Sequence, residues 1–413
     1  MTLFASVDAF WVGTRIGPTG LAAVSTSLFW IWMIISIAEM ISVGMTAVVA
    51  RRYGQGRNDE AIRIAGSALI VSVMLGLFIA VLGLSNLLAL FGVMRTPDEV
   101  RSLGTTYLGT YLLGTPLLFG FFAVDAAFRA AGDTRTPFVL LLTSVAITLV
   151  LDPVLILGLG PAPTLGIAGA AIATVTIRGG VFVMGLAIAL RRRLIRLGAI
   201  QWSAVWSVCR VGLPTALTGV MFSVIYIGLT RTTTRFGVPA LAALGIGHRV
   251  ESWLYMIGVG FGAATAAIVG QNLGAHQNDR AYRAGWLAVA FCFVPGVIAS
   301  VAQLTFAPHF AALFTSDAAV VDEAARYLRI AALAQFAVCT EVVLEGAMGG
   351  AGDTIPPMIT STAFTAARIP LAAWAADRWN ATGIWWVLSA TALCRGLGMM
   401  ALWKSRRWER KSV

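Results

Sequence analysis

The feature that most constrains the fold of this chain is a long internal repeat. At an offset of 220 residues, Gly54, Asn58, Asp59, Ala61 and Arg63 recur as Gly274, Asn278, Asp279, Ala281 and Arg283, and Ala131-Gly132-Asp133-Thr134 recurs as Ala351-Gly352-Asp353-Thr354. Later matches, including Gly166-Ile167 with Gly383-Ile384 and Arg178-Gly179 with Arg395-Gly396, follow at an offset of 217. The ordered series indicates a duplicated unit of about 200 residues, far longer than the ~20–50 residues of a solenoid repeat.

The composition is that of a membrane protein. Hydrophobic residues make up 58% and charged residues 12% of the chain, against about 45–50% and about 25% in soluble domains, and the mean hydropathy is +0.83. Apolar runs long enough to cross ~30 Å of hydrocarbon recur along the chain. The net charge of +11 would suggest nucleic acid in a soluble chain, but here the arginines lie in short gaps between apolar runs. We therefore expect the lipid bilayer as a partner and no nucleic acid.

Six apolar spans are predicted in each repeat. In the first repeat they are 1–14, 21–50, 61–93, 103–127, 136–158 and 165–190, and in the second 211–233, 239–269, 281–314, 324–350, 355–376 and 382–403. Because six is even, both repeats enter the membrane from the same side, which predicts an all-α integral membrane protein of 12 transmembrane helices in two parallel six-helix repeats. The predicted domains are an N-terminal lobe (1–190), a basic cytoplasmic linker (191–208), a C-terminal lobe (209–403) and a basic cytoplasmic tail (404–413).

The first span is too short to cross a bilayer. Its repeat partner starts near Val211, which corresponds to a position before Met1. A helix of 1–14 covers about 20 Å at ~1.5 Å per residue, less than the ~30 Å hydrocarbon core. We therefore expect a truncated first helix, through a misassigned start or a real truncation, with a genuine half-span as the alternative.

Arginine and lysine set the predicted orientation. The gaps after the second, fourth, sixth and eighth spans are richer in arginine than the opposite gaps, and the tail adds Lys404, Arg406, Arg407, Arg410 and Lys411. By the positive-inside rule, the basic side is cytoplasmic. We expect a multi-pass protein of the cytoplasmic membrane with both termini in the cytoplasm.

Two acidic residues within the predicted spans of the first repeat are the leading candidates for function. Asp8 and Asp152 are predicted at similar depth in the outer half of the membrane, where a charge is costly. Two acids in one bundle could share a proton or a small cation such as Na⁺. Neither is duplicated, since Asp8 corresponds to Gly228 and Asp152 to Ile369. A purely structural role for Asp152, next to Pro153, is the alternative.

Other polar residues within the spans are secondary candidates. Glu39, Glu251 and Glu341 could line a cavity, and Tyr107 and Tyr111 could form part of an aromatic wall for a flat cation. Duplication favours structural or gating roles for three pairs, which are Asp125 with Glu345, Arg178 with Arg395, and Asp133 with Asp353 in the Gly-Asp-Thr turns.

The chain lacks the sequence motifs of enzymes and nucleotide sites. The three histidines are scattered, and there is no His-Glu-x-x-His, no Gly-x-Ser-x-Gly and no Walker loop. The four cysteines lie in apolar stretches without paired spacing, so we expect neither a disulfide nor a metal site. We expect no enzymatic activity and no cofactor, and transport energy from a gradient of H⁺ or Na⁺.

An ordered set of motifs resembles the multidrug and toxic compound extrusion (MATE) family, and within it the DNA-damage-inducible (DinF-like) bacterial branch. These motifs are Val7-Asp8-Ala9-Phe10-Trp11, Ala131-Gly132-Asp133-Thr134, Leu151-Asp152-Pro153, Gly166-Ile167-Ala168-Gly169, Val269-Gly270-Gln271-Asn272 and Arg368-Ile369-Pro370. The resemblance implies two six-helix lobes around a central cavity, and export of small organic compounds, cations among them, as H⁺ or Na⁺ enters. It also implies that acids matching Asp8 and Asp152 bind the coupling ion. An Asn often precedes the second acid by one turn, and this chain has Thr148 there.

Three other functions stay open on the residues alone. A lipid-linked precursor flippase of the same superfamily is the nearest alternative to a drug antiporter. An intramembrane enzyme would use Asp8 and Asp152 as an aspartyl pair, and an inactive remnant would fit the short first span. We expect a monomer, and the sequence does not choose between H⁺ and Na⁺ or name the substrate.

Overall fold

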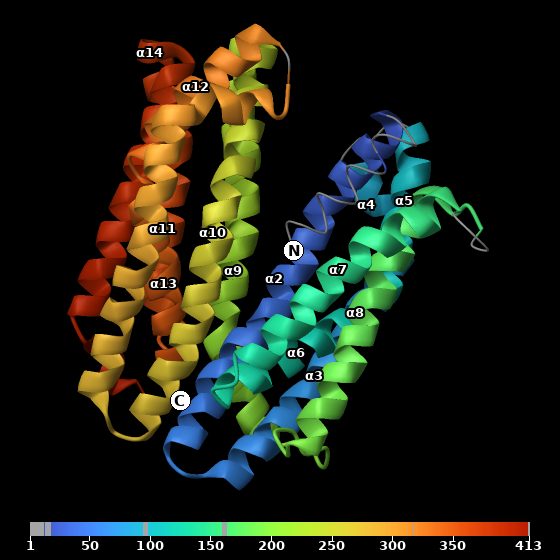
Figure 1. Cartoon of the computed structure of the whole chain (residues 1–413), viewed down its shortest axis with the longest axis vertical. Helices are drawn as coiled ribbons and strands as arrows, with labels where there is room; N and C mark the ends of the chain where they lie inside the picture. Colours follow the sequence, from blue (N-terminus) through green and yellow to red (C-terminus); the bar gives the residue numbers. More distant parts are fainter. Residues whose placement is uncertain (1–11, 13–17, 94–97, 159–162, 316, 412–413) are drawn as a thin grey trace. The chain divides into compact units, whose positions relative to one another are not determined.

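The protein folds into α-helices joined by short connections (Figure 1). The structure is a computed structural model that describes residues 12, 18–93, 98–158, 163–315 and 317–411, and none of these lies in a β-strand. The chain divides into two compact units, Met1–Ala216 and Leu217–Val413. The predicted all-α membrane fold is confirmed.

The first unit is a bundle built from the first repeat. Its described helices are α2 (Pro18–Gly54), α3 (Asn58–Ser85), α4 (Leu87–Val93), α5 (Asp98–Leu113), α6 (Thr115–Ala130), α7 (Arg135–Leu157), α8 (Gly166–Arg191) and the first half of α9 (Trp202–Thr233). Helix α6 packs on α2, α3 and α8, so it lies at the centre of the unit. The predicted span 1–14 falls almost wholly outside the described residues.

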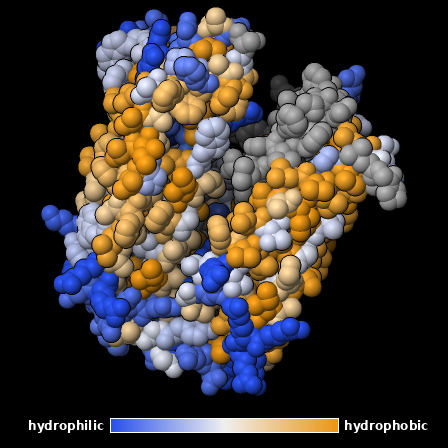
Figure 2. All heavy atoms as spheres, viewed as in Figure 1, coloured by the Kyte–Doolittle hydropathy of each residue, from blue (hydrophilic) through white to orange (hydrophobic). Residues whose placement is uncertain are grey.

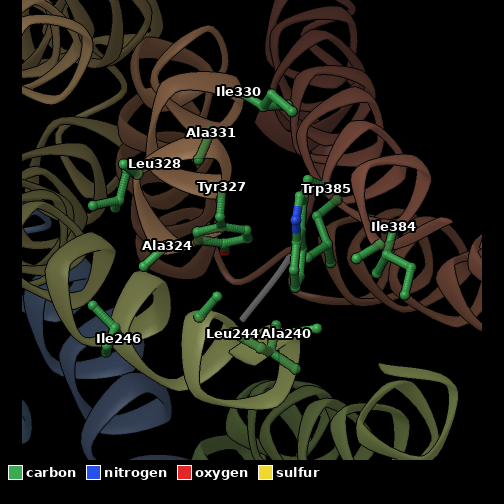
Figure 3. Close-up of a cluster of buried hydrophobic side chains, with 14 of the residues drawn as sticks. Ala240, Leu244, Ile246, Ala324, Tyr327, Leu328, Ile330, Ala331, Ile384 and Trp385 are labelled. Atoms are coloured by element: carbon green, nitrogen blue, oxygen red, sulfur yellow. The ribbon is translucent and has the colours of Figure 1, made fainter. Parts of the chain in front are cut away.

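The second unit repeats this arrangement. It contains the second half of α9, the 3₁₀ turn η1 (Thr234–Phe236), α10 (Gly237–Gly274), α11 (Asn278–Ala312), α12 (Ala318–Ala332), α13 (Gln335–Ala351), α14 (Ile355–Lys404) and the 3₁₀ turn η2 (Arg407–Arg410). Helix α13 packs on α10, α11 and α14, the position that α6 has in the first unit. Figure 3 shows the apolar core on one side of this unit, where the rings of Tyr327 and Trp385 meet edge to face at 4.8 Å.

Helix α14 makes two passes, as predicted by the spans 355–376 and 382–403. It contains 50 residues, or about 75 Å at ~1.5 Å per residue, more than twice the hydrocarbon thickness. Trp379 and Asn380 leave helical geometry, with φ +53° at Asn380. Arg368 donates from Nε to Thr391 Oγ1 at 2.8 Å across the break, so the two halves run side by side.

Two predicted single spans are bent instead. Span 103–127 consists of α5 and α6, which meet at 48°, and span 324–350 consists of α12 and α13, which meet at 58°. Both bends occur beside a glycine of the neighbouring helix. A Cβ on Gly76 of α3 would lie 2.8 Å from Pro116 Cα, and one on Gly296 of α11 would lie 3.3 Å from Phe336 Cα. These positions are related by the offset of 220, so the duplication preserves the bend and the glycine that accommodates it.

Among the described residues, eight helices are long and apolar enough to span a membrane, or ten if each bent pair counts once. Dividing α14 at its break gives eleven spans in the described residues. Large apolar side chains cover the outside of the helices, among them Phe78, Val150 and Ile298, each more than half exposed. Figure 2 shows hydrophobic residues over the middle of the helices and hydrophilic ones near the ends. This is the pattern of a protein whose outer surface contacts lipid.

The connection between the repeats is held on the first unit. Residues 192–201 are not helical, and α9 begins at Trp202, so the later part of the predicted linker 191–208 is the first two turns of α9. The α9 backbone touches α2 at two glycines, because a Cβ on Gly44 would collide with the Val208 carbonyl and one on Gly212 with the Met40 carbonyl. The boundary between the units follows at Ala216, two residues after Pro214.

The duplicated Gly-Asp-Thr turns end α6 and α13 in the same way. Gly132 and Gly352 have φ of +89° and +80°. Asp133 N donates to Phe128 O at 2.9 Å, and Asp353 N donates to Met348 O at 3.0 Å. These bonds satisfy the last carbonyls of each helix in the left-handed glycine motif common at helix ends.

Each turn also binds the segment that follows the last helix of its own repeat, α8 in the first and α14 in the second. Arg192 Nη1 donates to Asp133 Oδ2 at 2.7 Å, and Lys411 Nζ lies 3.5 Å from Asp353 Oδ1. The predicted basic tail therefore packs on the second unit, where Trp408 is buried and stacks on Trp403 at 4.0 Å. The structural role of Asp133 and Asp353 stays a prediction, and these contacts name the partners that it would involve.

Replacing Asp133 with asparagine should lower the thermal stability of the first unit. Thr136 donates its backbone N–H and its hydroxyl to this carboxylate, at 2.9 and 2.5 Å, and Arg192 adds the charged bond. Burial favours the neutral acid, but these bonds together outweigh it and lower the pKa of Asp133. We expect Asp133→Asn to cost about 1–2 kcal/mol at pH 7, read as the midpoint of thermal unfolding by tryptophan fluorescence.

The same interaction gives a pH dependence with a defined sign. Because the folded-state pKa of Asp133 is lowered, its stabilising effect is complete above the ordinary carboxyl pKa of about 4 and is lost as pH falls through the lowered value. The difference between wild type and Asp133→Asn should therefore shrink below about pH 4. Asp98→Asn is the control, since the side chain of Asp98 is 86% exposed and pairs with Arg101 on its own helix. Equal midpoints for all three proteins at pH 7 would show that the turn does not need the carboxylate.

A second prediction concerns helix contact in the second unit. A Cβ on Gly262 of α10 would lie 2.9 Å from the Val342 carbonyl of α13, whereas one on Gly260 would meet nothing within 4 Å. We expect Gly262→Val to cost about 1–3 kcal/mol through overpacking, and Gly260→Val on the same helix to have little effect. The measurement is the thermal midpoint in detergent, and similar losses for both variants would contradict the close approach of α10 and α13.

Candidate functional site

The leading acid of the first unit is buried on a polar face of α7. The side chains of Asp152 and Thr148 are 0% and 1% exposed. With buried Ser144 they occupy positions i, i+4 and i+8, one face of the helix. Thr148 Oγ1 donates to Ser144 O at 2.8 Å, while Leu149 and Val150 on other faces are exposed. Helix α7 thus presents apolar side chains outward and hydroxyl and carboxyl groups inward.

The end of α7 that carries Asp152 is fixed against α8. Gly158 ends the helix at φ +68°, and Leu165 N donates back to Leu155 O at 3.1 Å. A Cβ on Gly169 of α8 would lie 2.6 Å from the Leu155 carbonyl, so the two backbones nearly touch. Asp152 therefore lies on a part of α7 that packs closely on α8. Asp8, its predicted partner, lies outside the described residues.

The two tyrosine candidates are in the core of the same unit. Tyr107 and Tyr111 of α5 are both buried among apolar residues of α2, α5, α6 and α8. Arg178 of α8 donates from Nη1 to Tyr111 Oη at 3.0 Å, and its guanidinium lies 6.0 Å from the centre of the same ring. Arg178 therefore links α8 to α5 through Tyr111.

A separate polar cluster joins α2 and α6. Asp125 and Arg129 form an ion pair one turn apart on α6. Arg129 Nη2 also donates to Ser42 Oγ of α2 at 2.8 Å. Glu39 lies one turn before Ser42 with an exposed side chain and interacts electrostatically with Arg129. Asp125 is thus an ion-pair partner of Arg129, and its structural or gating role stays a prediction.

The second unit contains a larger buried polar network, centred first on Glu251. Tyr327 Oη of α12 donates to Glu251 Oε2 of α10 at 2.9 Å. Gln335 Nε2 of α13 lies 3.5 Å from Glu251 Oε1 and donates to Gln303 Oε1 of α11 at 3.1 Å. Helices α10, α12 and α13 thus meet at one carboxylate, and α11 joins them through Gln335. The sequence identified Glu251 without these partners.

Glu341 is the centre of the other half of this network. Ser361 donates to Glu341 Oε1 at 2.9 Å, and Arg395 Nη2 lies 3.3 Å from Oε2. Arg395 also donates to Thr365 Oγ1 at 3.2 Å. Arg178 and Arg395, paired by the repeat, therefore have different acceptors, since Arg178 bonds a tyrosine and Arg395 a carboxylate. Glu345, one turn after Glu341, lies on the same helix.

Sequence reasoning missed several members of the second-unit network. Gln303 and Gln335 are amides inside apolar spans, so the rule that singled out the charged residues would have found them. Tyr327 and Thr391 are uncharged residue types that are common in membrane helices, so the sequence alone does not single them out. Their partners follow from the packing of α10, α12 and α14. Across the described residues, no three His, Cys, Asp or Glu side chains come close enough together to hold a metal ion.

Comparison with known proteins identifies the family. The MatE family model matches residues 1–154 and 214–374. The chain is 28% identical to the probable multidrug resistance protein NorM of Thermotoga maritima, covering 94% of this chain and 85% of that protein. It is 27% identical to the probable multidrug resistance protein YoeA of Bacillus subtilis, covering 87% of this chain and 80% of that protein. It is also 28% identical to a protein named FAD transporter in Shewanella oneidensis, covering 79% of this chain and 73% of that protein.

Solved structures agree on the fold. A MATE transporter of Vibrio cholerae superposes with a TM-score of 0.91 at 20% identity, covering 99% of this chain and 96% of that one. An outward-facing MATE family transporter superposes with a TM-score of 0.92 at 22% identity, covering 98% of this chain and 91% of that one. The family match covers more than half of the chain and confirms the resemblance of its motifs. The chain belongs to the MatE family, whose members are multi-pass membrane transporters and not enzymes.

Proposed function

We propose that this protein is an antiporter that exports small organic compounds across the cytoplasmic membrane by alternating access, driven by entry of H⁺ or Na⁺. The observation that carries the proposal is the fully buried Asp152 on the polar face of α7. The names of the multidrug resistance relatives support the substrate class. The positive-inside pattern supports cytoplasmic termini, and we expect the transporter to act as a monomer.

In this mechanism, Asp152 is the site that senses the coupling ion. A charged carboxylate in a dry helix bundle is unfavourable, so binding H⁺ or Na⁺ lowers its desolvation cost. Asp8 would share the proton or complete the Na⁺ site, and the hydroxyl of Thr148, one turn from Asp152, would supply a further oxygen. Neutralisation would change the packing of the first span against α7 and shift the balance between inward-open and outward-open states.

The glutamates of the second unit belong to a network that links its helices. Glu341 has Arg395 and Ser361 as partners, and Glu251 accepts a hydrogen bond from Tyr327. Arg395 offsets the charge of Glu341. We therefore assign Glu251, Glu341 and Arg395 to the packing of α10, α13 and α14, and Asp125 and Glu345 to the stability of the central helices.

The test is gradient-driven efflux of a fluorescent organic cation from proteoliposomes, under a pH gradient and separately under a Na⁺ gradient. Asp152→Asn keeps the size of the side chain but removes the ionisable group. We expect it to reduce gradient-driven efflux by about tenfold or more, since ~1.4 kcal/mol of lost coupling already gives that factor. Asp8→Asn should have the same effect, and the gradient that drives the wild type identifies the ion.

Asp125→Asn and Glu341→Gln are the matched controls, because both acids lie inside spans but have an arginine partner. Each should lower stability while the remaining efflux still responds to the gradient. Intact efflux in Asp152→Asn together with lost gradient response in Glu341→Gln would move the coupling site to the second unit. Absence of efflux in the well-folded wild type would favour the lipid-linked precursor flippase.

One relative points to a second substrate class. The Shewanella oneidensis protein is named FAD transporter, and FAD is an anionic dinucleotide. In the second unit, Arg368 is buried and donates to the Thr391 hydroxyl and, at 3.4 Å, to the Leu388 carbonyl, while Glu341 and Glu251 interact with it electrostatically. Arginine suits phosphate recognition. FAD-loaded vesicles would test this candidate, with FAD efflux lost in Arg368→Gln but not in Arg283→Gln as the expected result.

A further inference from the structure

The linker between the repeats forms a cavity on the first unit. It has a volume of about 410 Å³ and is lined by Arg63 of α3 and by residues 196–201 of the linker. These residues lie at the end of α3 that follows the basic gap 55–57, on the side predicted to face the cytoplasm. No group of the proposed transport mechanism lies there.

Specific contacts fix the walls of this cavity. Arg196 N donates to Ile62 O at 3.2 Å, and Gln201 N donates to Ser67 Oγ at 3.1 Å, so both ends of the lining segment are bonded to α3. Between them, a Cβ on Gly66 would collide with the Arg196 carbonyl. The linker thus lies directly on α3, and the cavity is a built feature of the unit.

The cavity carries two arginines whose charge is not neutralised. Within the described part of the chain, neither Arg63 nor Arg196 forms an ion pair with a carboxylate, and Arg63 uses only Nε, which donates to the Asp59 carbonyl at 3.2 Å. Apart from Asp59, the acid nearest to Arg63 in the sequence is Glu60. Glu60 already forms ion pairs with Arg52 at 3.1 Å and with Arg57 at 2.5 Å. Two exposed guanidinium groups beside one cavity are suited to a phosphate.

The surface next to these arginines is apolar. Leu197 lines the cavity with its side chain 51% exposed, and Trp202 and Trp206, one turn apart at the start of α9, are 65% and 70% exposed. Tryptophan is enriched at the membrane interface, where its ring contacts lipid. A soluble phosphate compound would use the arginines alone, whereas a phospholipid would use both the arginines and the apolar side chains.

We infer that this cavity binds the phosphate headgroup of an anionic phospholipid from the cytoplasmic leaflet, with the acyl chains lying along Leu197, Trp202 and Trp206. Basic pockets at the cytoplasmic ends of membrane helices bind such headgroups. The bound lipid would join α3 to the linker and hold the linker on the first unit. In the second unit, the tail after α14 packs through Trp408 on Trp403.

The test is lipid binding by the purified full chain in neutral detergent, measured by native mass spectrometry. Phosphatidylglycerol is titrated against phosphatidylcholine with the same acyl chains. We expect the wild type to retain phosphatidylglycerol preferentially, and Arg63→Gln with Arg196→Gln to weaken that binding by about tenfold or more. Arg280→Gln with Arg283→Gln is the charge-matched control, because Arg283 is the repeat counterpart of Arg63, and it should bind like the wild type.

Two further arms distinguish a lipid from a soluble phosphate compound. In the first arm, glycerol phosphate in excess over the lipid should not displace phosphatidylglycerol. In the second arm, the double variant Trp202→Ala with Trp206→Ala should bind the lipid more weakly although both arginines remain. Hydrogen exchange of residues 196–201 should slow on adding phosphatidylglycerol to the wild type, but not to the Arg63/Arg196 variant. Equal binding of the two lipids, unchanged binding in that variant, or full displacement by glycerol phosphate would overturn the proposal.

Discussion

The absence of water in the bilayer core is the constraint on which this structure depends, because every backbone N–H and C=O must find a partner within the protein. The helices satisfy most of them, and their ends and bends need local solutions. Gly132 and Gly352 provide one at the ends of α6 and α13, where the chain turns back through left-handed geometry. Gly76 and Gly296 provide another, since each lets a bent helix approach the backbone of its neighbour. The scaffold is thus set by a few positions that the duplication keeps.

The duplication keeps the scaffold but not all of the polar groups within the spans. Asp152 corresponds to Ile369, and Glu251 and Glu341 correspond to Ile31 and Phe121 in the first repeat. Each unit therefore has its own intramembrane chemistry on the same arrangement of helices. In the second unit, hydrogen bonds from α12, α13 and α14 surround two glutamates, and Gln303 of α11 accepts from Gln335. This asymmetry is the physical reason for assigning coupling to one lobe and a mainly structural network to the other.

Sequence predicted the helices well because hydropathy reports burial in lipid directly. The spans 136–158 and 165–190 coincide closely with α7 and α8. The bends within 103–127 and 324–350 were missed because hydropathy continues through them, although Pro116 and the paired Gly76 and Gly296 were visible signals. Asp152 was found as a charge in an apolar run. Its place on a common face with Ser144 and Thr148 follows from helical spacing, whereas the partners of Glu251 depend on helices distant in sequence.

The basic connection after α8 shows why charge counting and geometry answer different questions. Arg192 and Arg196 lie four residues apart and contribute equally to the positive-inside signal. In the folded unit, Arg192 is bonded to Asp133 and Thr136, whereas Arg196 lies at a cavity beside Arg63. An arginine held by a carboxylate has little left to offer a second anion, and one beside an open cavity keeps its donors for a ligand. The number of arginines on each side thus predicts the orientation in the membrane. Binding of an anion depends instead on the arginines that, like Arg196, have no ion pair with a carboxylate in the described part of the chain.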